Sequence, residues 1–124
     1  MTNRRQFIQA SVSGSAILGL GLAGCSKSDD KKSGSAIKAG FVYVSPIGDA
    51  GWTYQHDLGR LEMEKSMAGK VTTSFVEKVA EGADAERVIR EMASSVNKIV
   101  FATSFGYMNY VEKVAKDFPK VVFM

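Results

Sequence analysis

The sequence of 124 residues contains one cysteine, one histidine and two prolines, and the first two scarcities exclude whole classes of protein. A single cysteine, Cys25, cannot form an intramolecular disulfide, so a disulfide-stabilised scaffold is excluded. The only histidine, His56, has no cysteine or histidine companion, so we expect no metal site and interpret His56 as a helix-surface or packing residue. The sequence also lacks two nucleotide-binding motifs, Gly-x-Gly-x-x-Gly after the first predicted strand and the P-loop motif. Their absence removes the main support for a bound nucleotide cofactor.

No group of residues has the pattern of a catalytic site. Ser45 lies before Pro46 without a general base in view. His56 and Asp57 are adjacent on a predicted helix and therefore face different directions. We expect a protein that is not an enzyme and that carries no cofactor.

The excess of positive charge, with an isoelectric point near 9.0, belongs to the N-terminal part of the chain. From Ala39 onward the sequence has 10 Lys and Arg against 11 Asp and Glu, a net charge of −1. The surplus comes from Arg4, Arg5 and the lysines at 27, 31, 32 and 38. Since the folded part offers no basic surplus for phosphates, no nucleic-acid partner is expected.

The first 37 residues have the pattern of an export signal and a tether. Residues 1–24 combine Arg4-Arg5 with a short apolar run, typical of a signal peptide; the paired arginines favour the Tat route and remain compatible with Sec. "LAGC" resembles a bacterial lipobox, which implies lipidation of Cys25 and attachment to a membrane facing the periplasm or cell exterior. Residues 25–37, with the polar run "SKSDDKKSGS", are predicted to be a flexible linker.

Residues 38–124 alternate between short apolar runs and amphipathic segments. Strands are predicted at 39–44, 71–76, 98–102 and 120–124, and helices at 52–68, from about 83, and at 108–118. The first helix presents Tyr54, Leu58 and Leu61 on one face. This βαβαβαβ order predicts an α/β fold, a parallel sheet with helices on both faces. The chain stops within its last strand, so we interpret it as part of a longer protein; a complete four-stranded domain is the alternative.

Ligands of open parallel sheets bind beyond the carboxyl ends of the strands. The loops after the first and third strands should face one another there in a 2-1-3-4 strand order. They offer aromatic and small polar side chains suited to a flat, uncharged ring: Ser45, Asp49, Trp52, Thr53, Ser104, Phe105 and Tyr107. The only tryptophan, Trp52, directly follows Gly51 at the strand-to-helix turn, where it either stacks on a ligand or fastens the start of the helix. The pattern leaves both interpretations open.

The stretches "KAGFVYVSPIGDAGWTYQHDLGRLEME" and "FATSFGYMNYVEKVAKDFPKVVF", behind a lipobox and a spacer, resemble the basic membrane protein (BMP) family. These lipoproteins deliver purine nucleosides or nucleobases to ABC transporters. The resemblance covers residues 37–124. It implies a type I periplasmic-binding-protein-like (flavodoxin-like) fold, a purine base or nucleoside as ligand, and an ABC transporter permease as partner. It also implies that residues 38–124 form a partial N-terminal lobe, so this chain alone is not expected to bind tightly.

The resemblance also suggests which residues contact the ligand. Many members carry an Asp-Lys-Ser-Phe-Asn-like run after the first strand, where Asp49 matches the Asp and Trp52 the Phe. Gly51 and Thr53 replace the Ser and Asn, which removes ribose contacts that are familiar in the family. A free base such as adenine is therefore as plausible a ligand as a nucleoside. Phe105 matches another wall of the family pocket. An exported Rossmann-like or flavodoxin-like enzyme domain and a sensory domain of the same fold remain alternatives.

Overall fold

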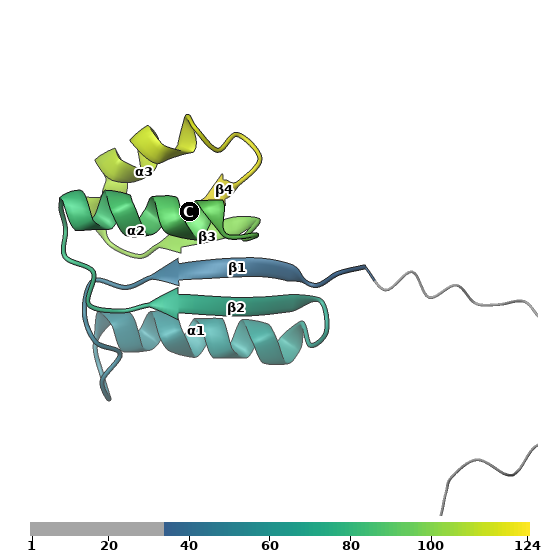
Figure 1. Ribbon diagram of the computed structural model, residues 1–124. Helices are drawn as coiled ribbons and strands as arrows, with labels where there is room; N and C mark the ends of the chain where they lie inside the picture. The colour runs from purple at the N-terminus through teal and green to yellow at the C-terminus, as the bar shows by residue number, and fades with distance from the viewer. Residues whose placement is uncertain (1–33) are drawn as a thin grey trace, which may run out of the picture. The chain divides into compact units, whose positions relative to one another are not determined.

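The computed structural model describes residues 34–124, so the predicted signal peptide, Cys25 and most of the predicted linker lie outside the described part. Eight elements follow in the order β1 (Ile37–Val42), α1 (Trp52–Ser66), β2 (Val71–Val76), α2 (Ala83–Ser94), β3 (Ile99–Ala102), the 3-10 helix η1 (Phe105–Tyr107), α3 (Met108–Ala115) and β4 (Val122–Phe123). Figure 1 shows α1 beside β2, with α2 and α3 near β3 and β4. The alternation of strands and helices confirms the predicted fold class.

The four strands form one parallel sheet in the order β2-β1-β3-β4, as expected. In register, Phe41 of β1 lies opposite Phe75 of β2 and Phe101 of β3. β1 and β3 are therefore the central neighbours, and β2 and β4 form the two edges of the described sheet. This order places the ends of β1 and β3 side by side.

One face of the sheet is covered by α2 and α3 through an apolar core. Ile89 and Val88 of α2 and Val114 of α3 pack with Val42 of β1 and Val100 of β3, and all are buried. Because these apolar residues recur at the helical period, the sequence pattern predicted the inward side of α2. Burial of such side chains is the main source of stability on this face.

The opposite face, beneath α1, combines a smaller apolar cluster, which includes Phe41 and Tyr43 of the first strand segment and Met63 of α1, with buried polar side chains. Thr53, Asp57 and Arg60 of α1 are buried, whereas Leu58 and Leu61 are 41% and 47% exposed. The face predicted from Tyr54, Leu58 and Leu61 is therefore not the buried face of this helix. The reason is that Asp57 and Arg60 pair with each other at 2.7 Å, so their charges are compensated beneath the helix.

Further contacts complete this polar layer. The Tyr43 hydroxyl donates to Asp57 Oδ1 at 3.3 Å, and Arg60 Nη1 donates to Thr73 Oγ1 at 2.9 Å. Thr73 in turn donates from its backbone N–H and its hydroxyl to Glu64 Oε1. Burial, followed by the nearby Asp57 charge, raises the pKa of Tyr43 to about 12. The side chains of Asp57, Arg60 and Glu64 thus all have partners on the sheet segment or on the helix itself.

Several element boundaries differ slightly from the prediction. β1 begins at Ile37, inside the segment assigned to the linker, because Ile37 N–H donates to Lys70 O and aligns β1 with β2. α3 ends at Ala115 rather than 118, since tighter turn hydrogen bonds replace the α-helical pattern before Pro119. Within residues 34–124, no helix is long and apolar enough to cross a membrane.

Candidate ligand-binding edge of the sheet

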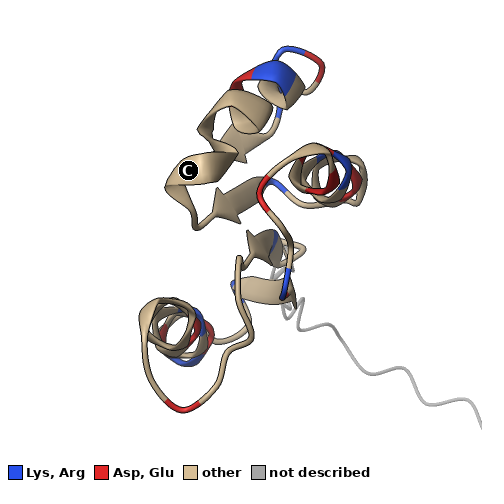
Figure 2. Cartoon of the chain, turned by 90° about the vertical axis from the view of Figure 1, so that its left-hand side faces the viewer, with Lys and Arg blue, Asp and Glu red and all other residues tan. Residues whose placement is uncertain are grey.

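The loops that follow β1, β2 and β3 meet at the edge where these parallel strands end. Figure 2 looks toward this edge and shows most charged residues along the helices, with only short charged stretches on the loops. No group of three or more His, Cys, Asp or Glu side chains that could hold a metal is present in residues 34–124. The chemistry of this edge comes from aromatic rings, hydroxyls and carboxylates.

Trp52 joins the loop after β1 to the loop after β3. Its indole Nε1–H donates to the carbonyl oxygen of Thr103 at 2.6 Å. Thr103 is itself anchored, because its N–H and its hydroxyl both donate to Val42 O at the end of β1. The ring of Trp52 nevertheless remains 64% exposed. Trp52 therefore fastens the two loops and still offers a free aromatic surface, so the two sequence interpretations are compatible.

An open hollow with a volume of about 440 Å³ adjoins this ring and is lined by Gly51, Trp52, Gln55 and His56. The ring centroids of His56 and Trp52 are 4.7 Å apart in an edge-on arrangement. His56 is thus a packing residue one helical turn below Trp52, as predicted. An aromatic wall beside an amide side chain can hold a flat ring and hydrogen-bond its rim.

The polar candidates of the first loop divide into buried and exposed residues. The hydroxyls of Ser45 and Thr53 share a hydrogen bond of 2.7 Å, and Thr53 is only 1% exposed. This pair holds the loop against α1. Asp49 is exposed and makes no hydrogen bond with any residue of the described part. Gly51 adopts a φ of 96°, a backbone conformation that favours glycine and allows the chain to turn into α1.

The loop after β3 likewise separates its aromatic residues. Phe105 is 86% exposed at the start of η1. Tyr107 is fully buried and donates from its hydroxyl to Val79 O at 2.6 Å. Burial, together with the charges of Glu81 and Asp84, raises the pKa of Tyr107 to about 12. This placement differs from the expectation that Tyr107 faces a ligand, because its ring fills the core beside α2 and so supports the loop from beneath.

Two glutamates from the loop after β2 were missed by sequence reasoning. Glu77 Oε2 accepts from Ile47 N–H at 3.0 Å, which ties the second loop to the first. Glu81 accepts from the Ser104 hydroxyl, which ties the second loop to the third. Their place just beyond a predicted strand was the available signal, since parallel strands end at a common edge. The three loops therefore form one connected layer.

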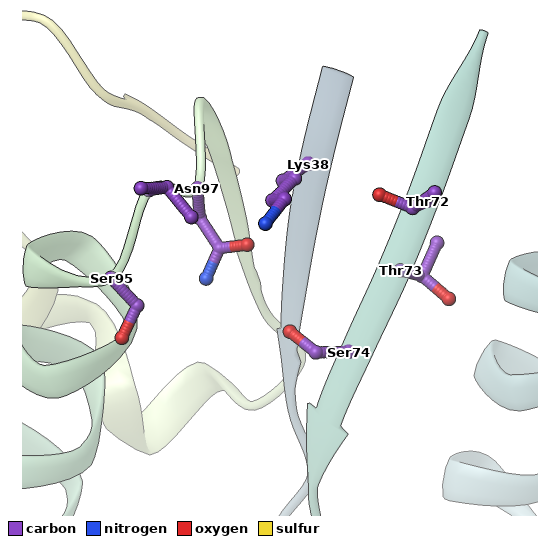
Figure 3. Close-up of a pocket in the computed structure, with 7 residues that line it drawn as sticks. Lys38, Thr72, Thr73, Ser74, Ser95 and Asn97 are labelled. Atoms are coloured by element: carbon purple, nitrogen blue, oxygen red, sulfur yellow. The ribbon is translucent and has the colours of Figure 1, made fainter. Parts of the chain in front are cut away.

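A second hollow, of about 250 Å³, lies near the amino ends of the strands (Figure 3). Lys38 of β1, Ser74 of β2 and Asn97 from the loop before β3 contribute polar groups to it. Asn97 is 7% exposed and donates to Met92 O, which fixes this loop to the end of α2. This hollow lies far along the strands from the loop layer that contains Trp52, so the two are separate features.

Comparison with known proteins gives a consistent assignment of family. The model of the family described as "ABC transporter substrate-binding protein PnrA-like" matches residues 36–124. A purine-binding protein of Brucella abortus is 50% identical over 107 residues, which cover 86% of this chain and 29% of that protein. A putative ABC transporter glucose-binding protein of Haloferax volcanii is 37% identical over 90 residues, covering 73% of this chain and 22% of that protein.

Solved structures show the same fold. A solute-binding protein of an ABC transporter system from Conexibacter woesei has a TM-score of 0.65 at 19% identity and covers 71% of this chain and 28% of that one. Its counterpart from Aeropyrum pernix has a TM-score of 0.62 at 20% identity, covering 70% of this chain and 23% of that one. The chain spans less than a third of the length of the curated relatives it matches.

Proposed function

The chain belongs to the Bmp family of PnrA-like ABC transporter substrate-binding proteins, and from this premise we propose that it binds a purine base or nucleoside for import. In this proposal, residues 38–124 are part of the first of two lobes, and the ligand lies between the lobes. Residues 1–24 direct export, and a lipid on Cys25 together with the linker 25–37 anchors the protein outside the cytoplasm. An ABC permease then receives the ligand.

The observation that carries the proposal is the arrangement of Trp52. Its indole N–H is fixed to Thr103 O, yet its ring stays largely exposed at the edge where parallel sheets bind ligands. Phe105 adds a second exposed ring on the facing loop. Such rings gain most from a flat aromatic ligand. The 50% identity to a purine-binding protein supports the same ligand class.

A sugar is the second candidate ligand. One relative carries the description of a putative glucose-binding protein, at 37% identity. A sugar ring also presents an apolar face that can lie against an indole, while its hydroxyls would meet Asp49 and Ser104. An enzymatic function has less support, because the relatives are solute-binding proteins.

The test needs a complete ligand site, which a chimera provides. Residues 36–124 replace the matching segment of the Brucella abortus relative, and adenine, guanosine and glucose are titrated by calorimetry. Stacking on one base is worth about 1–3 kcal/mol, so Trp52→Ala should weaken purine binding by about fivefold to 150-fold. Leu58→Ala, on the exposed side of α1, is the matched control. The unmodified relative checks the assay, and circular dichroism checks that each variant folds.

Three results are distinguishable. Purine binding that depends on Trp52 supports the proposal. Glucose binding without purine binding assigns the site to sugars. Purine binding that is the same in the Trp52→Ala chimera and its parent means that Trp52 only fastens the loops, and the proposed use of its ring is then wrong.

The anchor has its own test in the intact chain. Cys25→Ser should move the protein from the membrane fraction to the soluble exported fraction, and mass spectrometry should show loss of the acyl modification. A parent chain whose Cys25 carries no lipid would contradict the anchoring part of the proposal and leave the ligand part standing.

A further inference from the structure

Glu81 occupies an unusual position for a residue next to a helix. It directly precedes Gly82, the N-cap residue of α2, where a carboxylate would normally gain from the N–H groups of the first helical turn. No side chain caps α2, however, and the Glu81 carboxylate instead accepts from Ser104 on the loop after β3. The side chain has therefore turned away from its own helix and toward the candidate ligand edge.

Gly106 provides the space that Glu81 occupies. A Cβ atom built on Gly106 would collide with the carboxylate carbon and both carboxylate oxygens of Glu81. The carboxylate thus lies against the backbone of η1 at Gly106, the residue after the exposed Phe105. Any larger residue at position 106 would push the carboxylate out of this place.

The charge of Glu81 is not neutralised by a neighbour. Within residues 34–124, Glu81 forms no ion pair with a lysine or arginine, whereas Glu77 and Glu91 each do. Glu81 is exposed to solvent, and its carboxylate can accept more hydrogen bonds than the one from Ser104. A charged acceptor that is not ion-paired thus lies where the loops after β2 and β3 meet, with one hydrogen bond from Ser104.

From this geometry we propose that Glu81 contacts the ligand and selects purines that carry a hydrogen-bond donor on the ring edge, such as the exocyclic amine of adenine. Ser104 and Gly106 act as positioning residues, because Ser104 donates to the carboxylate and Gly106 leaves the space that it occupies. The inference rests on the proposed function, since it specifies the ligand of the same site. A structural role, in which Glu81 merely ties two loops, is the competing explanation.

The test compares adenine with unsubstituted purine, which has no exocyclic amine. A hydrogen bond to a charged group is worth about 1.5–3 kcal/mol, so the parent chimera should prefer adenine by about tenfold or more. Glu81→Ala should remove this preference while changing the affinity for purine little. Gly106→Ala should have the same effect, although it leaves the glutamate in the sequence. Glu91→Gln, on the exposed side of α2, should keep the parent's preference.

A direct measurement uses the protein's own segment Lys32–Met124, which forms a compact unit. In NMR spectra, adenine should shift the amide signals of Ser104 and Gly106 more than purine does, and Glu81→Ala should remove this difference. This readout detects weak binding, so it does not require the second lobe.

The outcomes separate the inference from its premise. If the parent chimera binds purines and Glu81→Ala keeps the preference for adenine, the inference is overturned and the proposed function stands. Equal losses for adenine and purine in Glu81→Ala identify Glu81 as a loop tether, which also overturns the inference. If the parent binds neither purine while the Brucella relative does, the proposed function fails and the role of Glu81 fails with it.

Discussion

The two faces of the sheet are built on different physical principles although they share the same strands. Val42 of β1 points into the apolar core beneath α2 and α3. Its neighbour Tyr43 lies in the smaller apolar cluster of the opposite face, and its hydroxyl donates to the buried, ion-paired Asp57 of α1. An apolar core is destabilised when one of its side chains is made smaller, but it constrains the orientation of a helix only through the shapes of the packed side chains. A network of hydrogen bonds and ion pairs also fixes the orientation of the helix that takes part in it.

The difference matters for the candidate site because Trp52 is the first residue of α1. Thr53, Asp57, Arg60 and Glu64 follow one another at helical spacing, and each contacts the sheet, the preceding loop or the network under the helix. These contacts set the rotation of α1 about its own axis. We therefore expect the polar face to determine where Trp52 points and the apolar face to supply most of the stability.

The largest effect is expected on the apolar face. Ile89 is fully buried, and Ile89→Ala removes apolar contacts and leaves a cavity. The free energy of unfolding of Lys32–Met124 should fall by about 4 kcal/mol, measured by urea denaturation with circular dichroism. A loss below about 1 kcal/mol would show that this face is not the main source of stability.

Breaking the ion pair on the polar face should cost somewhat less. Arg60→Met leaves the Asp57 carboxylate beneath α1 without its cation, and both side chains are 10% exposed. The expected loss is about 3 kcal/mol, at the lower end for buried pairs because of this residual exposure. The double variant Asp57→Leu with Arg60→Met should recover most of the loss. Trp52 fluorescence should change in the single variant, since the rotation of α1 is no longer fixed; an unchanged spectrum would contradict that role.

A smaller effect should appear at high pH and should be shared by the two faces. Tyr43 and Tyr107 each have a pKa raised from 10.0 to about 12 in the folded protein. Above pH 10 the unfolded chain loses these protons while the folded chain keeps them, so stability should fall between about pH 10 and 12. Tyr43→Phe should reduce this slope and Tyr107→Phe should reduce it similarly. A slope unaffected by both substitutions would mean that other groups cause it.

The smallest effect is expected at Leu58, which lies on the apolar face predicted for α1 from the sequence. Because Leu58 is 41% exposed, Leu58→Ser should change the free energy of unfolding by no more than about 0.5 kcal/mol. Urea denaturation beside Ile89→Ala gives the direct contrast. A loss comparable to that of Ile89→Ala would restore the original interpretation of α1.

Most of the fold could be predicted because its strands are short runs rich in β-branched and aromatic residues. "VTTSFV" matches β2 without error, and the βαβαβαβ order leaves few ways to arrange a parallel sheet. The meeting of the loops after β1 and β3 followed from that topology, and the bond from Trp52 to Thr103 confirms it. Whether Asp49, Trp52 and Phe105 contact a ligand stays a prediction.

What sequence reasoning missed depends on contacts between distant segments. Hydrophobic periodicity gives no weight to a charge that is neutralised, so Asp57 and Arg60 were not recognised as inward residues. Their spacing of three residues, which suits an ion pair along a helix, was the usable signal. Glu81 was missed as well: its place after a predicted strand was a signal, but its partner Ser104 is 23 residues away and could not be assigned from the sequence.

The position of β2 at the edge of the sheet has a consequence for solubility. Six residues without charge or proline, Val71–Val76, run along an edge whose outer N–H and C=O groups have no strand beside them in the described part. Such a strand is a template for pairing with a second copy and, in the end, for aggregation. Lys70 precedes this strand, and Glu77 and Lys78 follow it. These three charges act as gatekeepers, because stacking identical copies in register would bring like charges together at both ends of the strand.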